Sequence, residues 1–77
     1  HMGKIVEILK DIRPECDWEH AVDFIANGML DSFDIIVLVT ELESAYPISV
    51  DGSDILAENF SSLESIADLV RKSGGIV

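Results

Sequence analysis

Residues 31–46 have the sequence DSFDIIVLVTELESAY, and this stretch decides the fold that we predict for the chain. Taken alone, the apolar run at residues 35–39 would also suit a buried strand. Apolar side chains nevertheless continue at helical spacing for three turns, at Ile35, Leu38, Val39, Leu42 and Tyr46. The Asp-Ser pair in front supplies an N-cap, and Pro47 closes the segment. We therefore predict a helix over about residues 32–46 with those five residues facing the core.

Two further helices are predicted on either side of this segment. An apolar stripe at residues 5, 8, 9 and 12 followed by Pro14 predicts a helix over about residues 3–13. A capping box, with Ser61 as the cap and Glu64 three residues later, precedes a second stripe at residues 63, 66, 67 and 70. That pattern predicts a helix over about residues 62–72, ahead of the Gly74-Gly75 pair.

The segments between the helices are predicted to be a loop and a turn. Residues 14–31 form a long connection with apolar anchors at Trp18, Val22, Phe24, Ile25, Met29 and Leu30. A short helical turn over residues 23–27 would end at Gly28, and we expect Trp18 to cover the helix ends. After the turn at residues 51–54, Ser53 or Asp54 would cap a short helix reaching Ala57. The predicted fold is all-α: a small bundle of three main helices plus one short helix.

Composition limits the classes of function. The 77 residues suit a single domain (1–77), of which His1 is typical of a cloning remnant. The net charge is −10, and residues 14–70 contain no Lys or Arg. Binding of nucleic acid or of an anionic membrane surface is therefore disfavoured, and a protein partner with a basic patch is favoured. A single cysteine, no signal-like segment and no long apolar run predict a soluble, cytoplasmic monomer that does not insert into membranes.

The helix over residues 32–46 carries a second apolar face, away from its predicted core face. Its apolar members are Phe33, Ile36 and Val37, and its acidic rim consists of Asp34, Glu41 and Glu43. An apolar patch rimmed by carboxylates predicts a protein-binding surface. The alternative is that the preceding loop covers the patch.

Ser32 stands at the beginning of this helix. Its simplest role is an N-cap, but Asp31 can cap equally well, which would leave the Ser32 hydroxyl pointing outward. A phosphate on Ser32 would then lie at the positive end of the helix macrodipole.

The sequence NGMLDSFDI at residues 27–35 resembles the phosphopantetheine attachment region of acyl carrier proteins. In that family an Asp-Ser pair and a bulky apolar residue follow a short Gly-containing turn. The resemblance extends through Glu41-Leu42-Glu43, the loop at residues 48–54 and residues 58–66, and so covers nearly the whole chain.

This resemblance implies an acyl-carrier-protein-like bundle that is not itself an enzyme. Ser32 would carry a covalent 4′-phosphopantetheine, transferred from coenzyme A by a phosphopantetheinyl transferase, and the thiol would hold cargo as a thioester. Asp31 would help to position the metal and basic residues of the transferase. Phe33, Ile36 and Val37 would give partner enzymes an apolar contact, and the carboxylates of the rim would meet their basic residues.

The resemblance is closest to stand-alone aminoacyl carriers, such as D-alanyl carriers, that work with an adenylating ligase. Val37 and Ser44 stand where carriers of fatty-acid synthesis often have carboxylates, and Phe33 replaces their more usual Leu. A fatty-acyl or polyketide carrier, served by an acyl transferase or synthase, is the alternative within the class. From a different class, an acidic helical interaction domain without a prosthetic group would use the same helix for docking.

Support in the sequence for any other metal or catalytic site is weak. Cys16 and His20 supply two soft ligands where a structural zinc site needs four, and no third group orients them as a catalytic pair. We therefore predict no metal site and no catalytic residue, and expect His20 at the surface.

Overall fold

The computed structural model describes residues 3–20 and 23–76 of the chain, and within these ranges it contains α-helices and 3-10 turns but no strand. His1 and Val22 lie outside the described residues. Along the chain the elements are α1 (Gly3–Ile12), α2 (Ser32–Ala45), η1 (Gly52–Asp54), η2 (Ala57–Phe60) and α3 (Leu63–Lys72). The predicted all-helical class is confirmed, and each main helix begins and ends within one residue of its predicted bounds.

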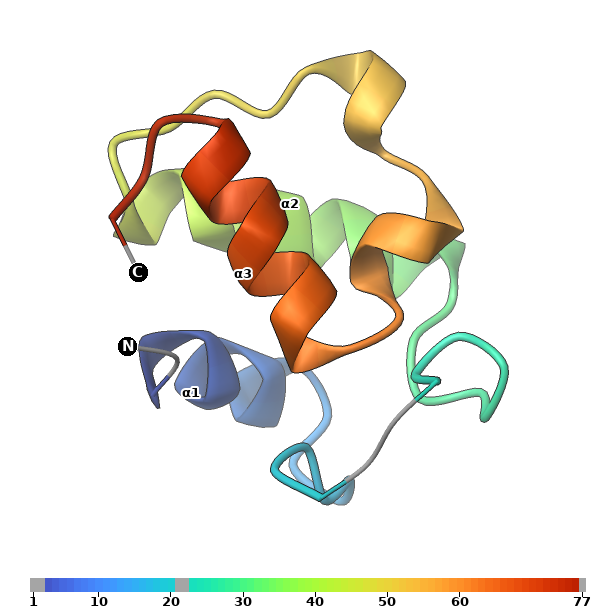
Figure 1. Ribbon diagram of the computed structural model, residues 1–77. Helices are drawn as coiled ribbons and strands as arrows, with labels where there is room; N and C mark the ends of the chain where they lie inside the picture. Colours follow the sequence, from blue (N-terminus) through green and yellow to red (C-terminus); the bar gives the residue numbers. More distant parts are fainter. Residues whose placement is uncertain (1–2, 21–22, 77) are drawn as a thin grey trace.

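The three helices pack around one apolar core. Helix α1 lies against α2, α3 packs on η2, and α1 also contacts α3. In Figure 1, α2 and α3 cross above α1. Each helix contributes side chains with no exposed area, and the segments between the helices add large ones: Ile5, Leu9, Trp18, Phe24, Leu30, Leu38, Leu42, Phe60, Ile66 and Val70. Burial of this apolar surface is the main force that holds such short helices together.

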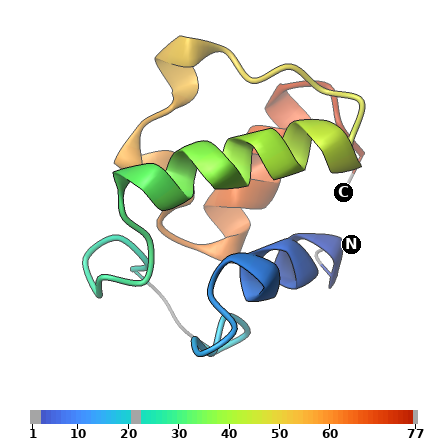
Figure 2. The same ribbon diagram turned by 180° about the vertical axis from the view of Figure 1, so that it is seen from behind.

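The predicted core face of α2 is confirmed. Leu38 and Leu42 are fully buried, Val39 and Tyr46 are nearly so, and Ile35 is partly buried against the core. Figure 2 shows α2 running across the molecule from the end where the connection from α1 arrives. The opposite side of the helix is therefore the side available to solvent.

The long connection at residues 13–31 is fastened by aromatic side chains. Trp18 is fully buried, its indole Nε1–H donates to the Arg13 carbonyl oxygen at 3.0 Å, and its ring meets that of Phe24 edge-on at 4.9 Å. Further along, the N–H of Asn27 donates to the Asp23 carbonyl, and Gly28 ends this turn with a φ of +73°. Trp18 is thus buried beside the end of α1, and residues 23–27 form a hydrogen-bonded turn rather than a turn of helix before Gly28.

Two details of the predicted helix ends are wrong. The N-cap of α3 is Ser62 rather than Ser61, and its reciprocal partner is Ser65 rather than Glu64, with backbone-to-hydroxyl distances of 3.1 and 3.0 Å. Ser62 has the extended backbone that an N-cap needs, whereas Ser61 is in the right-handed helical region.

The predicted short helix near residues 53–57 is also wrong. The chain forms the two 3-10 turns there instead, because Ile55 leaves the helical region between them. The cap of η1 is Asp51, whose carboxylate accepts the Ser53 N–H at 2.9 Å, rather than Ser53 or Asp54.

Candidate functional site

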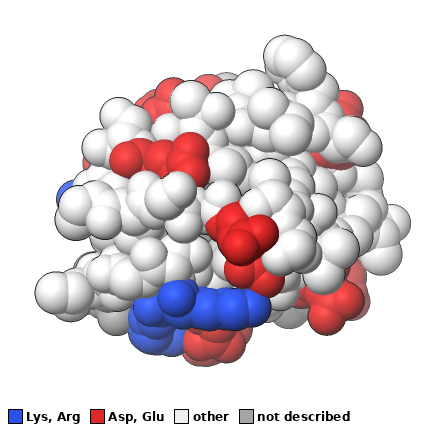
Figure 3. Space-filling model, turned by 90° about the horizontal axis from the view of Figure 1, so that it is seen from above, with Lys and Arg blue, Asp and Glu red and all other residues white. Residues whose placement is uncertain are grey.

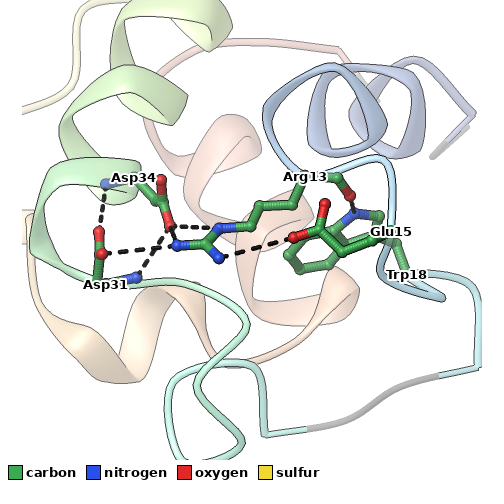
Figure 4. Close-up of polar contacts among 5 residues, drawn as sticks. All are labelled: Arg13, Glu15, Trp18, Asp31 and Asp34. Carbon is green, nitrogen blue, oxygen red and sulfur yellow. Dashed lines mark hydrogen bonds and ion pairs between the residues drawn. The ribbon is translucent and has the colours of Figure 1, made fainter.

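Ser32 is the first residue of α2 and is exposed. The capping position belongs to Asp31, whose carboxylate accepts the Asp34 N–H at 2.9 Å, while the Asp34 carboxylate accepts the Asp31 N–H at 3.3 Å. Figure 4 shows this reciprocal pair at the start of the helix. Because Asp31 caps the helix, the Ser32 hydroxyl forms no hydrogen bond with any of the described residues. The serine therefore presents an accessible hydroxyl from a fixed backbone.

Arg13 connects the end of α1 to this capping box. Its Nε and Nη2 atoms lie 2.9 and 2.8 Å from Asp34 Oδ2, and Nη2 lies 3.6 Å from Asp31 Oδ2 (Figure 4). The hydrogen bond and the charge of Asp34 raise the pKa of Arg13. The pKa of Asp31 is lowered, chiefly by the Asp34 N–H that its carboxylate accepts and further by the charge of Arg13. The Asp31 and Asp34 carboxylates thus lie before and after Ser32 in the sequence, beside one guanidinium.

The apolar side of α2 is open to solvent. Phe33 is 74% exposed and Ile36 is 55% exposed, while Val37 is partly buried. The alternative in which the preceding loop covers this patch is therefore wrong for Phe33 and Ile36. Side chains of this size are seldom left exposed next to each other on a helix without a partner.

The acidic rim differs from the sequence prediction at one position. Asp34 is only 8% exposed and is turned toward Arg13, so the expected exposed position is wrong. Glu41 is exposed, and Glu43 is exposed while its carboxylate accepts the Val50 N–H at 2.9 Å. Asp31, Glu41 and Glu43 therefore remain available to the surroundings, and Asp34 serves the helix start instead.

A hollow of about 290 Å³ adjoins Ser32. It is lined by Ser32, Ile35 and Ile36 from α2, by Ile55, which directly follows η1, and by Ala57, the first residue of η2. Ile55 and Ala57 were not among the predicted site residues, because only folding brings them next to α2. Their apolar character, one and three residues after the acidic turn at residues 51–54, was the one available signal.

A larger hollow of about 700 Å³ lies between α1 and α3, with Val6 and Leu63 among its lining residues and the Lys10–Glu19 ion pair (3.2 Å) at its side. The described residues that line it include none of the predicted site residues and no cysteine, serine or histidine. Ser32 and its smaller hollow therefore form the stronger candidate site.

Surface charge is uneven. On the face shown in Figure 3 basic side chains gather mainly at one edge, while acidic side chains occur in several separate groups. Several of the basic side chains are engaged by carboxylates, including Lys72 with Asp54 and Arg71 with Asp68, both at 2.8 Å. A partner that approaches α2 would thus meet mostly negative charge.

The Cys16 and His20 region holds no ligand cluster. Cys16 is partly buried, and His20 is exposed, as expected, with its Nδ1 atom 3.0 Å from Asp17 Oδ2. The hydrogen bond with His20 lowers the pKa of Asp17. Over residues 3–20 and 23–76, no three His, Cys, Asp or Glu side chains are arranged to hold a metal ion. No helix in these ranges is long and apolar enough to cross a membrane.

Comparison with known proteins adds no relative. Scans against protein-family models, curated proteins and solved structures found no match to this chain. Its function is therefore inferred from the residues around Ser32 and from the resemblance of its sequence motif.

Proposed function

We propose that this chain is a carrier protein of the acyl-carrier type, with an acyl-carrier-protein-like bundle and a 4′-phosphopantetheine on Ser32. The observation that carries the proposal is the exposed Ser32 hydroxyl at the first position of α2, which is left without a hydrogen bond to the described residues because Asp31 caps the helix. A helix that needed Ser32 only as a cap would hold its hydroxyl against the backbone.

The residues around Ser32 suit this group. A phosphodiester on the hydroxyl would be attached at the positive end of the α2 macrodipole, which favours negative charge. The hollow lined by Ile35, Ile36, Ile55 and Ala57 offers apolar surface beside the attachment point. When bound, phosphopantetheine supplies a thiol on a long flexible arm that can hold an acyl or aminoacyl group as a thioester. The chain's own residues then bind and orient the arm and supply no acid or base.

The partners would be a phosphopantetheinyl transferase and the enzyme that loads or uses the cargo. Phe33 and Ile36 offer an apolar contact that a partner would bury, and Asp31, Glu41 and Glu43 would pair with basic residues around it. We place this activity in the cytoplasm, where coenzyme A is available as the donor.

For the cargo we propose an aminoacyl group, such as D-alanyl, loaded by an adenylating ligase. This rests on the motif, in which Phe33 follows the serine and Val37 and Ser44 stand in place of carboxylates. A fatty-acyl or polyketide carrier is the alternative within the class. Charging by an adenylating ligase with ATP and D-alanine, compared with charging by an acyl transferase, separates the two.

A second candidate function is favoured by the exposure of Phe33 and Ile36 alone. An acidic interaction domain could dock a basic protein on this patch with no prosthetic group. Such a domain would retain its partner after Ser32→Ala, whereas a carrier would lose all loading.

The test is the intact mass after incubation with coenzyme A and a promiscuous phosphopantetheinyl transferase. Ser32→Ala is compared with Ser44→Ala, which removes another exposed hydroxyl from the same helix. We expect the parent and Ser44→Ala to gain one phosphopantetheine and Ser32→Ala to gain none, with all three equally helical. A folded parent that gains nothing, or loading of Ser32→Ala, would contradict the proposal.

A further inference from the structure

Arg13 is the cation that the structure places at the start of α2. The sequence provides no other Lys or Arg between residues 14 and 70. The other basic residues have contacts elsewhere: Lys4 with the Ala45 carbonyl, Lys10 with Glu19, Arg71 with Asp68 and Lys72 with Asp54. Nothing else in the described residues can therefore replace Arg13 beside Ser32.

One carboxylate oxygen makes the shortest contacts between Arg13 and the capping box. Asp34 Oδ2 accepts hydrogen bonds from Nε of Arg13 and from the Asp31 N–H, and it forms an ion pair with Nη2 of Arg13. The Asp34 side chain is only 11% exposed. An ionised carboxylate with so little access to water needs a positive partner, and it would otherwise turn toward solvent. If Asp34 turned, the Asp31 N–H would lose its acceptor and the first turn of α2 would fray.

The charge is not needed for capping as such. Helix α3 has the same reciprocal arrangement built from the hydroxyls of Ser62 and Ser65, with no cation involved. In α2 both members are carboxylates, Asp31 and Asp34, and they flank Ser32. Because its capping box is built from two carboxylates, the first turn of α2 depends on Arg13, whereas the first turn of α3 needs no cation.

Arg13 is itself held in place. Its N–H donates to the Leu9 carbonyl at 2.9 Å, and its own carbonyl accepts the Trp18 indole N–H at 3.0 Å. The guanidinium thus extends from a backbone fixed on both sides, and only part of its side chain is in solvent.

We propose that Arg13 is the positioning residue of the Ser32 site: it neutralises Asp34, keeps the first turn of α2 helical and so fixes how the Ser32 hydroxyl is presented to the transferase. This inference rests on the proposed function. Under this inference, modification of Ser32 also requires Arg13, which lies 19 positions earlier at the other end of the connection.

The test compares phosphopantetheine transfer from coenzyme A to four variants, at a temperature where far-UV circular dichroism shows each to be fully folded. The variants are Arg13→Gln, Arg13→Lys, the double variant Arg13→Gln with Asp34→Ser, and Arg71→Gln as the matched control. Arg13→Gln should lower kcat/KM about tenfold or more, as expected when only about a tenth of the molecules hold the competent turn. Arg13→Lys should be intermediate, because a single ammonium group replaces the guanidinium fork.

The double variant separates positioning from a direct contact with the transferase. It removes the buried carboxylate and puts a serine hydroxyl at position 34, the group that Ser65 supplies in the box of α3, so transfer should return to within about twofold of the parent, as should transfer to Arg71→Gln. Transfer to Arg13→Gln at the parental rate would overturn the inference and leave the proposed function intact. A double variant as slow as Arg13→Gln would also overturn it, since Arg13 would then act by touching the enzyme. If the parent itself is not modified, the proposed function fails.

Amide hydrogen exchange of the unmodified chain provides a readout without the transferase. Residues 33–35 should exchange faster in Arg13→Gln and return to the parental rate in the double variant, while residues 64–66 of α3 stay unchanged. Unchanged exchange at residues 33–35 in Arg13→Gln would overturn the positioning role.

Discussion

Replacement of Trp18 tests how the connection at residues 13–31 is held, and with it the placement of the start of α2. Trp18 is fully buried, donates its indole N–H to the Arg13 carbonyl and meets Phe24 edge-on. Trp18→Ala removes all three contributions. Trp18→Phe keeps an aromatic ring near Phe24 and removes the hydrogen bond together with part of the volume.

The expected losses are large for a chain of this size. A 77-residue domain has an unfolding free energy of about 4–12 kcal/mol, at about 0.05–0.15 kcal/mol per residue. Trp18→Ala should remove about 3–5 kcal/mol, the usual cost of truncating a buried aromatic residue. Trp18→Phe should remove about 1–2 kcal/mol, of which a net loss of about 1 kcal/mol comes from the hydrogen bond. Trp18→Ala is therefore expected to be largely unfolded if the parent lies at the low end of the range.

Urea unfolding followed by far-UV circular dichroism measures these losses, since fluorescence is lost with the single tryptophan. With a slope of about 1 kcal/mol per molar urea, Trp18→Phe should lower the midpoint by about 1–2 M. His20→Ala is the control, because the His20 side chain is 83% exposed, and it should change the free energy by less than about 0.5 kcal/mol. A Trp18→Phe midpoint equal to that of the parent would refute the anchoring role of Trp18.

Four other perturbations follow from the structure. Phe33→Ala should change the unfolding free energy by less than about 0.5 kcal/mol because the ring is 74% exposed, yet raise the KM of the transferase about tenfold; an unchanged KM would exclude Phe33 from the partner contact. Ser62→Ala should cost about 1 kcal/mol and Ser61→Ala clearly less in thermal unfolding, and the reverse order would contradict the observed cap. Hydrogen bonds from Ser53 lower the pKa of Asp51 from its ordinary value of 3.8, so the stability that this carboxylate adds is complete above that pH and is lost below it. The difference in urea midpoint between the parent and Asp51→Ala should thus be constant from about pH 7 to about pH 5 and shrink as the pH falls below 3.8. Finally, like charges repel one another in a chain with a net charge of −10, so raising the salt concentration to about 0.15 M, where the screening length is about 8 Å, should raise the melting temperature. An unchanged melting temperature would show that this repulsion does not lower the stability.

The helices were predictable because their signals are local. The stripes of α1, α2 and α3 and the role of Pro14 lie within a few residues of one another, and the structure confirms them. The outward position of Ser32 was also predictable, because Asp31 offered a second cap directly beside it. The α3 cap was missed because Ser61 and Ser62 are chemically identical candidates, and only the backbone angles distinguish them.

The remaining errors come from contacts between distant residues. Asp34 falls on the outer side of a helical wheel, but Arg13, 21 residues earlier, draws its carboxylate inward. Likewise, Ile55 and Ala57 reach the Ser32 hollow only through the path that the chain takes from η1 into η2. Periodicity within one helix contains no information on either contact.

The central claim is that Ser32 carries phosphopantetheine, and the most direct measurement is made on the chain recovered from the cells that produce it naturally. The protein is digested, and the mass of the peptide that contains Ser32 is determined with fragmentation to locate any added group. The account predicts one phosphopantetheine, free or acylated, on the Ser32 oxygen. A Ser32 peptide found only at its unmodified mass, from a chain that coenzyme A and the transferase also leave unmodified, would contradict it.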